Sequence, residues 1–281
     1  MPNPLLNDKA FEDANKAGYA AGAWGPPQSR STPLGGPVGT GMSDGPVSRW
    51  DSRTMSIEGT ATATGVLFIL LLAAGAVGWQ LVETVDGVGV TKFPTWSIAG
   101  VLIGLGCVIG IHFKPHLAKI LGPIYALAEG IFIGAISHAY EGYKDGIVVQ
   151  AVGATIAVFA VMLFMYRTKI IKVNDRFRRI IIGATFGIMI FYGISLLINL
   201  FGGEVSFLQA NNGSLFSIGV SLFIAAIAAF NLALDFDFIE RGSKQGLPKQ
   251  MEWVAAVGLL VTVIWLYLEI LRLLAKLNSR R

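Results

Sequence analysis

Charged residues are scarce in this sequence, and cysteine and histidine are almost absent from it. Asp, Glu, Lys and Arg make up 14% of its 281 residues, against about 25% in typical soluble domains. The single cysteine, Cys107, excludes an intramolecular disulfide framework. Among the three histidines, His112 and His116 are separated by Pro115 and lack a third ligand, so the sequence predicts no metal site.

Motifs for catalysis and phosphate binding are also missing. The sequence has no Gly-rich phosphate loop, no Ser-His-Asp arrangement and no metalloprotease motif. We therefore predict that the protein is not an enzyme and carries no bound cofactor. The net charge of +4 is small, and its Lys and Arg residues segregate between the two sides of a membrane, so we predict no nucleic-acid partner.

Long apolar runs dominate the chain. Hydrophobic residues make up 53% of it, and the mean hydropathy is +0.61. Seven runs approach the roughly 20 residues that a helix needs to cross a bilayer. They predict an all-α polytopic membrane protein, a seven-transmembrane-helix bundle over residues 59–278. The predicted spans are 61–82, 96–113, 118–138, 146–166, 179–201, 214–238 and 251–274.

Residues 1–58 differ from the rest in composition. They are rich in Gly, Pro, Ser and Asn and show no helical or strand period. Such a segment buries too little apolar area to offset its ordering entropy. It is predicted to be a disordered tail.

The distribution of Lys and Arg predicts the orientation. The tail and alternate loops carry five, two, six and three of these residues, whereas the opposite loops carry one, one and none. The positive-inside rule therefore places the N-terminus in the cytoplasm of a plasma (inner) membrane protein. Seven crossings would put the C-terminus outside, yet that end is basic, with Arg272, Lys276, Arg280 and Arg281. The side of the C-terminus stays open.

Glycines recur at every fourth residue in several spans, for example at Gly100 and Gly104, Gly130 and Gly134, and Gly183 and Gly187. Small residues at this spacing let helix backbones approach closely in lipid. We expect these spans to pack on one another.

Carboxylates inside the apolar runs are the candidate functional residues. Asp235 and Asp237 end the sixth run, Glu269 lies late in the seventh, and Glu129 falls in the middle of the third. An ionisable group at such depth costs about 2.5–3.5 kcal/mol on insertion scales, so each is a functional-site hypothesis. Asn231, one turn before Asp235, is predicted to be its hydrogen-bond neighbour.

Each carboxylate also has a structural interpretation. The sixth span could end near Leu234, which would make Asp235 and Asp237 ordinary interfacial residues. Asp237 lies about 200° around the helix from Asp235 and faces elsewhere. Arg272 follows Glu269 by three residues and could neutralise it along one helix face.

Several stretches, taken together, resemble the Bax inhibitor-1/YccA family, and in particular its actinobacterial-type branch with a Gly/Pro-rich tail. They are EGIFIGAIS (129–137), GIVVQA (146–151), LDFDFIE (234–240) and LYLE (266–269). The resemblance covers roughly residues 60–275. It implies six helices around a central seventh and a pH-sensitive calcium leak governed by an acidic pair, here Asp235 and Glu269.

Helix arithmetic leaves the partner of Asp235 open. Asp235 lies within a turn of the end of its predicted span, whereas Glu269 lies about 27 Å along the returning helix at 1.5 Å per residue. Glu129 is closer in depth to Asp235 and is the alternative partner.

The expected function is therefore a cation leak under proton control, with Ca²⁺ as the expected ion, the buried carboxylates as proton or cation sensors, and Asp235 as the place where Ca²⁺ would bind. The alternative is a non-transporting regulator that binds membrane-protein partners or a membrane protease. In either case, the lipid bilayer is the predicted surrounding.

Overall fold

The computed structural model describes residues 54–82, 97–142, 144–202, 205 and 212–280. Within these residues, the regular structure is helical apart from one isolated β-bridge between Thr54 and Pro248. The elements are α3 (Ile57–Gln80), α4 (Ser97–Phe113), the 3₁₀ turn η1 (Pro115–Leu117), α5 (Ala118–Glu141), α6 (Ile147–Arg167), α7 (Asp175–Leu200), α8 (Leu215–Lys244) and α9 (Met251–Ser279). Most of the predicted tail, residues 1–53, lies outside the described residues.

Six of these helices are long and apolar enough to cross a membrane, which confirms the predicted all-α polytopic bundle. The helix α4 is shorter, with 17 described residues. Its length is about 25 Å at 1.5 Å per residue, below the roughly 30 Å of a hydrocarbon core. The residues that precede it, 83–96, lie outside the described part of the chain.

Four helices, α3, α7, α8 and α9, extend by four to six residues beyond their predicted spans, and polar residues continue α7 and α8. The helix α7 starts at Asp175, four residues before the predicted 179, since the Asn174 side chain caps it by accepting from the Phe177 amide. The helix α8 continues six residues past 238, to Lys244. Ion pairs along α8 support this extension, and Gly246, with a φ of +66°, follows its end. The apolar period alone cannot locate such charged ends.

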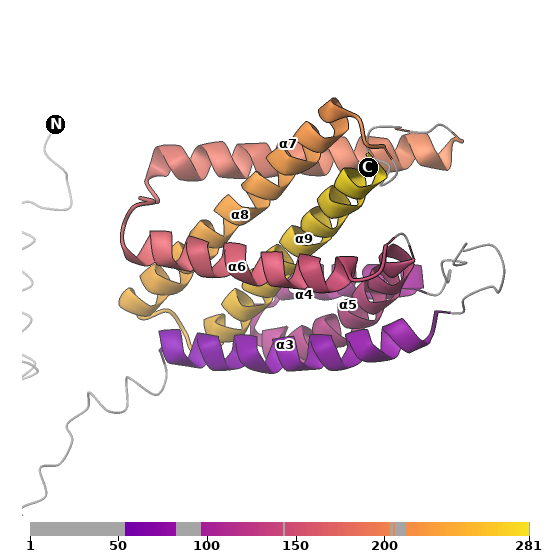
Figure 1. The fold of residues 1–281 in the computed structure, drawn as a ribbon. Helices are drawn as coiled ribbons and strands as arrows, with labels where there is room; N and C mark the ends of the chain where they lie inside the picture. The colour runs from indigo at the N-terminus through magenta and orange to yellow at the C-terminus, as the bar shows by residue number, and fades with distance from the viewer. Residues whose placement is uncertain (1–53, 83–96, 143, 203–204, 206–211, 281) are drawn as a thin grey trace, which may run out of the picture. The chain divides into compact units, whose positions relative to one another are not determined.

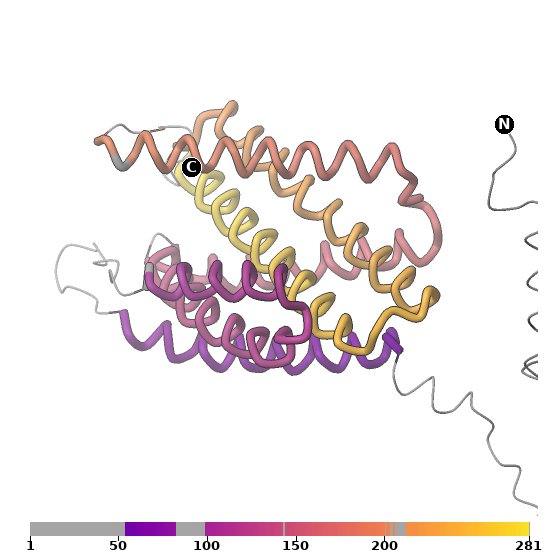
Figure 2. The backbone as a smooth tube through the Cα atoms, turned by 180° about the vertical axis from the view of Figure 1, so that it is seen from behind, coloured from indigo at the N-terminus to yellow at the C-terminus, as the bar shows by residue number. Residues whose placement is uncertain are grey.

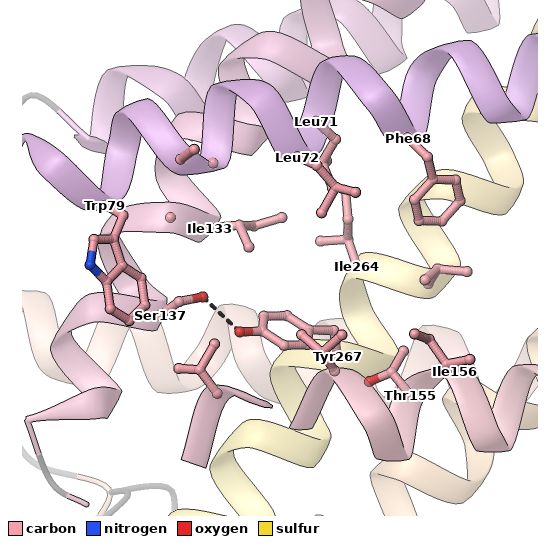
Figure 3. A pocket seen from close by; sticks show the side chains of 16 residues that line it. Phe68, Leu71, Leu72, Trp79, Ile133, Ser137, Thr155, Ile156, Ile264 and Tyr267 are labelled. Atoms are coloured by element: carbon pink, nitrogen blue, oxygen red, sulfur yellow. Dashed lines mark hydrogen bonds between the residues drawn. The ribbon is translucent and has the colours of Figure 1, made fainter. Parts of the chain in front are cut away.

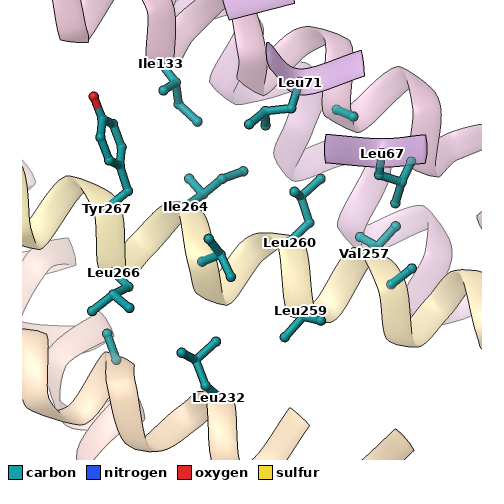
Figure 4. Packing of buried hydrophobic residues seen from close by; sticks show 14 of the residues in the cluster. Leu67, Leu71, Ile133, Leu232, Val257, Leu259, Leu260, Ile264, Leu266 and Tyr267 are labelled. Carbon is teal, nitrogen blue, oxygen red and sulfur yellow. The ribbon is translucent and has the colours of Figure 1, made fainter. Parts of the chain in front are cut away.

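The last helix, α9, is the most buried of the bundle. In its most apolar segment 72% of residues are buried, against 17–39% in the other five candidate spans. It crosses between α3 and α5 on one side and α6 and α8 on the other (Figures 1 and 2). Apolar side chains along it pack against α3, α5 and α8 (Figure 4). The central seventh helix implied by the resemblance is therefore present.

Among the described helices, α3 and α5 share the most extensive contact, and glycines lie within it. A Cβ at Gly134 would overlap the backbone of Gly75, and one at Gly78 would overlap the backbone of Ile131. The predicted contact through Gly130 and Gly134 is thus present, as small residues at a helix interface allow. The expectation for Gly183 and Gly187 is wrong, because a Cβ at either position would meet no described atom within 4 Å.

The folded unit begins slightly before residue 59, the predicted boundary. The Met55 amide donates to the Leu247 carbonyl at 2.7 Å, and the Met55 side chain is buried. Ser56 caps α3 and donates its hydroxyl and its amide to the Glu252 carboxylate, each at 2.9 Å. Residues 54–58 therefore belong to the bundle, tied to the turn between α8 and α9.

Candidate functional site

Asp235 lies inside the bundle, on the side of α8 that faces α9. The Thr262 hydroxyl of α9 lies against its carboxyl group but donates its hydrogen to the Gly258 carbonyl at 3.2 Å. The Oδ2 atom of Asp235 is buried and has no hydrogen-bond partner among the described residues. Because α8 continues to Lys244, Asp235 lies about 13 Å from the helix end and not within a turn of it. An unpartnered carboxyl oxygen in this setting carries a high desolvation cost.

Asn231 does not serve as the predicted hydrogen-bond neighbour of Asp235. Its Nδ2 donates to the Thr185 hydroxyl of α7 at 2.8 Å and to the Ile227 carbonyl at 2.9 Å. No hydrogen bond joins Asn231 to Asp235 in the part of the chain that the structure describes. A spacing of one turn places two residues on one face, but the side-chain rotamer selects the partner.

Asp237 is the best-compensated carboxylate of the four. It is 6% exposed and accepts from Arg178 Nη2 at 2.7 Å and from Arg241 Nε at 2.8 Å. Arg241 also donates to the Val173 carbonyl at 3.0 Å, before α7. Asp237 thus joins the α6–α7 connection, the start of α7 and the end of α8, which is a structural role.

Replacing Asp237 with asparagine should destabilise the protein by about 2 kcal/mol, because charge-assisted hydrogen bonds contribute about 1.5–3 kcal/mol and both arginines are partly exposed. The measurement is denaturant unfolding in detergent micelles, followed by circular dichroism. Lys244→Gln is the control, since it removes an exposed pair with Glu240 that should contribute less than about 1 kcal/mol. Equal stability of the two variants would contradict this role.

Glu269 is fully enclosed and is held by a tyrosine and an arginine. Its Oε1 accepts from the Tyr192 hydroxyl of α7 and from Arg272 Nη1 at 2.8 Å. Arg272 Nη1 also donates to the Tyr192 hydroxyl at 2.5 Å. The neutralising arginine considered from the sequence is therefore present. Even so, Glu269 Oε2 is buried without a partner among the described residues, as is Asp235 Oδ2.

The residues implied as an acidic pair do not face each other directly. Asp235 lies against Thr262, and α9 continues two turns beyond Thr262 before it reaches Glu269, about 10 Å along the axis. The same antiparallel alignment brings Lys276 to Ser221, near the start of α8. Asp235 and Glu269 thus occupy successive levels of the α8–α9 interface.

Glu129 faces a different helix from Asp235. Its carboxylate lies over Gly104 of α4, in the space that a Cβ there would fill. It makes no hydrogen bond or ion pair among the described residues. The helix α5 packs on α3, α4 and α9, whereas Asp235 is on α8. The structure therefore does not bring Glu129 beside Asp235.

Lys276 is a buried ionisable residue that the sequence reasoning assigned to a basic terminus. It is 0% exposed, and its Nζ donates to the Ser221 hydroxyl at 2.9 Å and to the Ser217 carbonyl at 3.3 Å. The spacing of Glu269, Arg272 and Lys276 by three and four residues places them on one helix face. This spacing, followed from the apolar part of α9 toward its end, is the sequence pattern that identifies Lys276 as a residue on the same helix face as Glu269.

The described carboxylates are dispersed through the bundle. No group of three or more His, Cys, Asp or Glu residues that could hold a metal ion occurs within the described ranges. A Ca²⁺ ion takes six to eight oxygen ligands, which neither Asp235 nor Glu269 could supply alone. The arrangement can instead bind and release a proton at a carboxyl oxygen without a partner.

Comparisons with curated proteins and with solved structures find no significant match. A family model described as Bax inhibitor 1 like matches residues 3–279, nearly the whole chain. The match agrees with the stretches that resemble this family and with the observed helical bundle. This chain is therefore an integral membrane protein that belongs to the Bax inhibitor 1 like family.

Proposed function

We propose that the protein is a cation leak of the plasma membrane, with its N-terminus in the cytoplasm, and that protonation of Asp235 controls it. The observation that carries the proposal is the buried Oδ2 of Asp235, which has no hydrogen-bond partner among the described residues. A charged carboxylate with an unpartnered oxygen is unfavourable in a membrane interior. Proton binding removes that charge, and deprotonation must be compensated by water or a cation.

The position of Asp235 allows this charge to act on the bundle. It lies between α8 and the central helix α9, among fully buried apolar residues such as Leu232 and Ala233. Water or a cation that solvates the deprotonated carboxylate has to separate α8 from α9. Glu269 lies two turns further along the α8–α9 interface. Its buried Oε2 has no partner among the described residues and offers a second contact to a cation that passes along this interface. We infer that the helix interface conducts when Asp235 is charged and closes when it is neutral.

Calcium is the proposed permeant ion, not a resident ligand. Hard cations prefer oxygen ligands, and the two unpartnered carboxyl oxygens provide successive contacts along α9. Because each carboxylate supplies few ligands to a Ca²⁺ ion, the ion passes along the interface and is not bound tightly at either residue. Protons and Na⁺ are the competing ions, and a flux assay separates them.

The test is flux through liposomes that contain the purified protein and an entrapped Ca²⁺ indicator. Wild type should admit more external Ca²⁺ as the pH rises through the titration of Asp235, because a larger fraction of the carboxylate is charged. Asp235→Asn should hold the flux at the low level that wild type shows in acid, because the amide stays neutral. Glu129→Gln is the matched control and should keep the pH response of wild type, since Glu129 faces α4.

Two outcomes contradict the proposal. Absence of flux at every pH, for Ca²⁺, Na⁺ and protons alike, would exclude a leak and direct attention to a regulator that binds membrane-protein partners. Flux with an unchanged pH response in Asp235→Asn would show that another group is the sensor. Circular dichroism of each variant establishes that the bundle is folded.

A further inference from the structure

A cavity of about 420 Å³ lies between α3, α5 and α6, with α9 as its floor (Figure 3). Its walls are almost entirely apolar, and Leu72, Ile133, Ile156 and Ile264 are among the residues that line it. An apolar space of this kind does not hold stable water. It contains neither Asp235 nor Glu269, so it is separate from the proposed leak site.

The cavity spans the depth of one membrane leaflet. Along α3 it extends from Phe68, at the middle of the helix, to Trp79, next to its end. This distance is about 16 Å at 1.5 Å per residue, close to half of the roughly 30 Å hydrocarbon core. The helix α6 lines the cavity only between Val148 and Ile156, in its first half. The cavity therefore lies within one leaflet of the membrane, and its end at Trp79 lies at the membrane–water interface.

The cavity is continuous with the lipid-facing surface. Leu72 of α3 and Ile156 of α6 line it and are 65% and 63% exposed, respectively. Ile69 and Val149, beside them on the same helices, are 69% and 75% exposed. Lipid chains that cover these side chains can therefore enter the cavity without crossing a polar barrier.

The cavity is elongated along α3, over about 16 Å from Phe68 to Trp79. An elongated apolar space of this kind suits a linear hydrocarbon chain. The close backbone contact between α3 and α5, through Gly75 and Gly134, keeps this wall from widening.

One polar pair lies in the cavity wall, toward its outer end. The hydroxyls of Ser137 and Tyr267 are 2.6 Å apart and share one hydrogen bond (Figure 3). Each hydroxyl carries one hydrogen, and neither residue has another hydrogen bond among the described residues. One hydroxyl hydrogen is therefore available for an acceptor in the cavity, such as an ester carbonyl.

We propose that this cavity binds one acyl chain of a membrane phospholipid. The ester carbonyl lies at the Ser137–Tyr267 pair, near the interfacial Trp79, and the terminal methyl lies at Phe68, near the bilayer midplane. The bound phospholipid thereby becomes a structural part of the bundle, with its acyl chain held between α3 and α6. This site does not depend on a leak activity.

The test uses tryptophan substitutions that either fill the cavity or leave it open. Ala76 lines the cavity, whereas Ala73, one turn earlier on α3, is exposed and does not line it. Wild type and each variant are purified from nanodiscs of palmitoyl-oleoyl phosphatidylglycerol, and retained lipid is counted by native mass spectrometry. Wild type and Ala73→Trp should retain one phospholipid, and Ala76→Trp should retain less by on the order of tenfold.

Photolabelling of wild type gives a second readout that needs no variant. A phosphatidylglycerol with a diazirine at the end of its acyl chain should label Phe68 and Ile264 more strongly than the exposed Ile190 of α7. Equal lipid retention by Ala76→Trp and wild type would overturn the proposal. Labelling that is even over all exposed helices, or retention of a lipid without acyl chains, would overturn it as well.

Discussion

Replacement of Arg272 by methionine is expected to destabilise the bundle by about 3–5 kcal/mol. Methionine keeps much of the apolar stem, so the change removes mainly the guanidinium that pairs with Glu269 at 2.8 Å. The Glu269 side chain is 2% exposed and cannot be reached by water without opening of the bundle. The Tyr192 hydroxyl remains as a neutral donor and compensates only part of the charge.

Denaturant unfolding in mixed micelles, followed by circular dichroism, measures this effect. The double variant Glu269→Gln with Arg272→Met is the decisive comparison, because it removes both charges. It should recover most of the lost stability, as expected when the cost comes from a buried charge left unpaired. A single Arg272→Met variant within about 1 kcal/mol of wild type would show that the ion pair does not hold α9 in place.

Gly134→Ala is expected to destabilise the bundle by about 3 kcal/mol, at the upper end of the range for overpacking. The added methyl group would overlap the Gly75 backbone of α3, and Gly75 is a position that cannot move as a flexible side chain can. The helices α3 and α5 must separate, and the contacts along their shared interface weaken. Thermal unfolding in detergent is the measurement.

Gly153→Ala is the matched control for this prediction. Gly153 also lies inside a helix, α6, but a Cβ there would meet no described atom within 4 Å. Alanine is favoured over glycine in a helix by about 0.5–1 kcal/mol, so the control should be neutral or slightly stabilising. A loss of stability as large as that of Gly134→Ala would mean that glycine matters for a reason other than close packing.

The positive charges near the C-terminus show how the tertiary structure changes a sequence argument. Of the basic residues counted there, Arg272 is paired with Glu269 and Lys276 is buried against Ser221. These two have roles inside the bundle and should not be counted as signals for membrane orientation. Without them, the basic C-terminus conflicts less with seven crossings and a cytoplasmic N-terminus.

Apolar run length and composition predicted the helical class and the approximate spans, because a bilayer imposes a length of about 20 apolar residues on every helix. The same apolar context identified Asp235, Asp237, Glu129 and Glu269 as costly carboxylates. The quoted stretches indicated the family that the match over residues 3–279 establishes. These properties are local, and each can be evaluated from a window of sequence.

Only the tertiary structure decided which carboxylate has which partner. Asp237 is paired with two arginines and Glu269 with one, whereas Asp235 Oδ2 has no hydrogen-bond partner among the described residues. Asn231, one turn away, bonds to Thr185 on another helix. Periodicity gives the face of a helix but not the rotation and depth at which it meets its neighbours. Those relations arise from packing between distant segments, and they also create the cavity between α3 and α6.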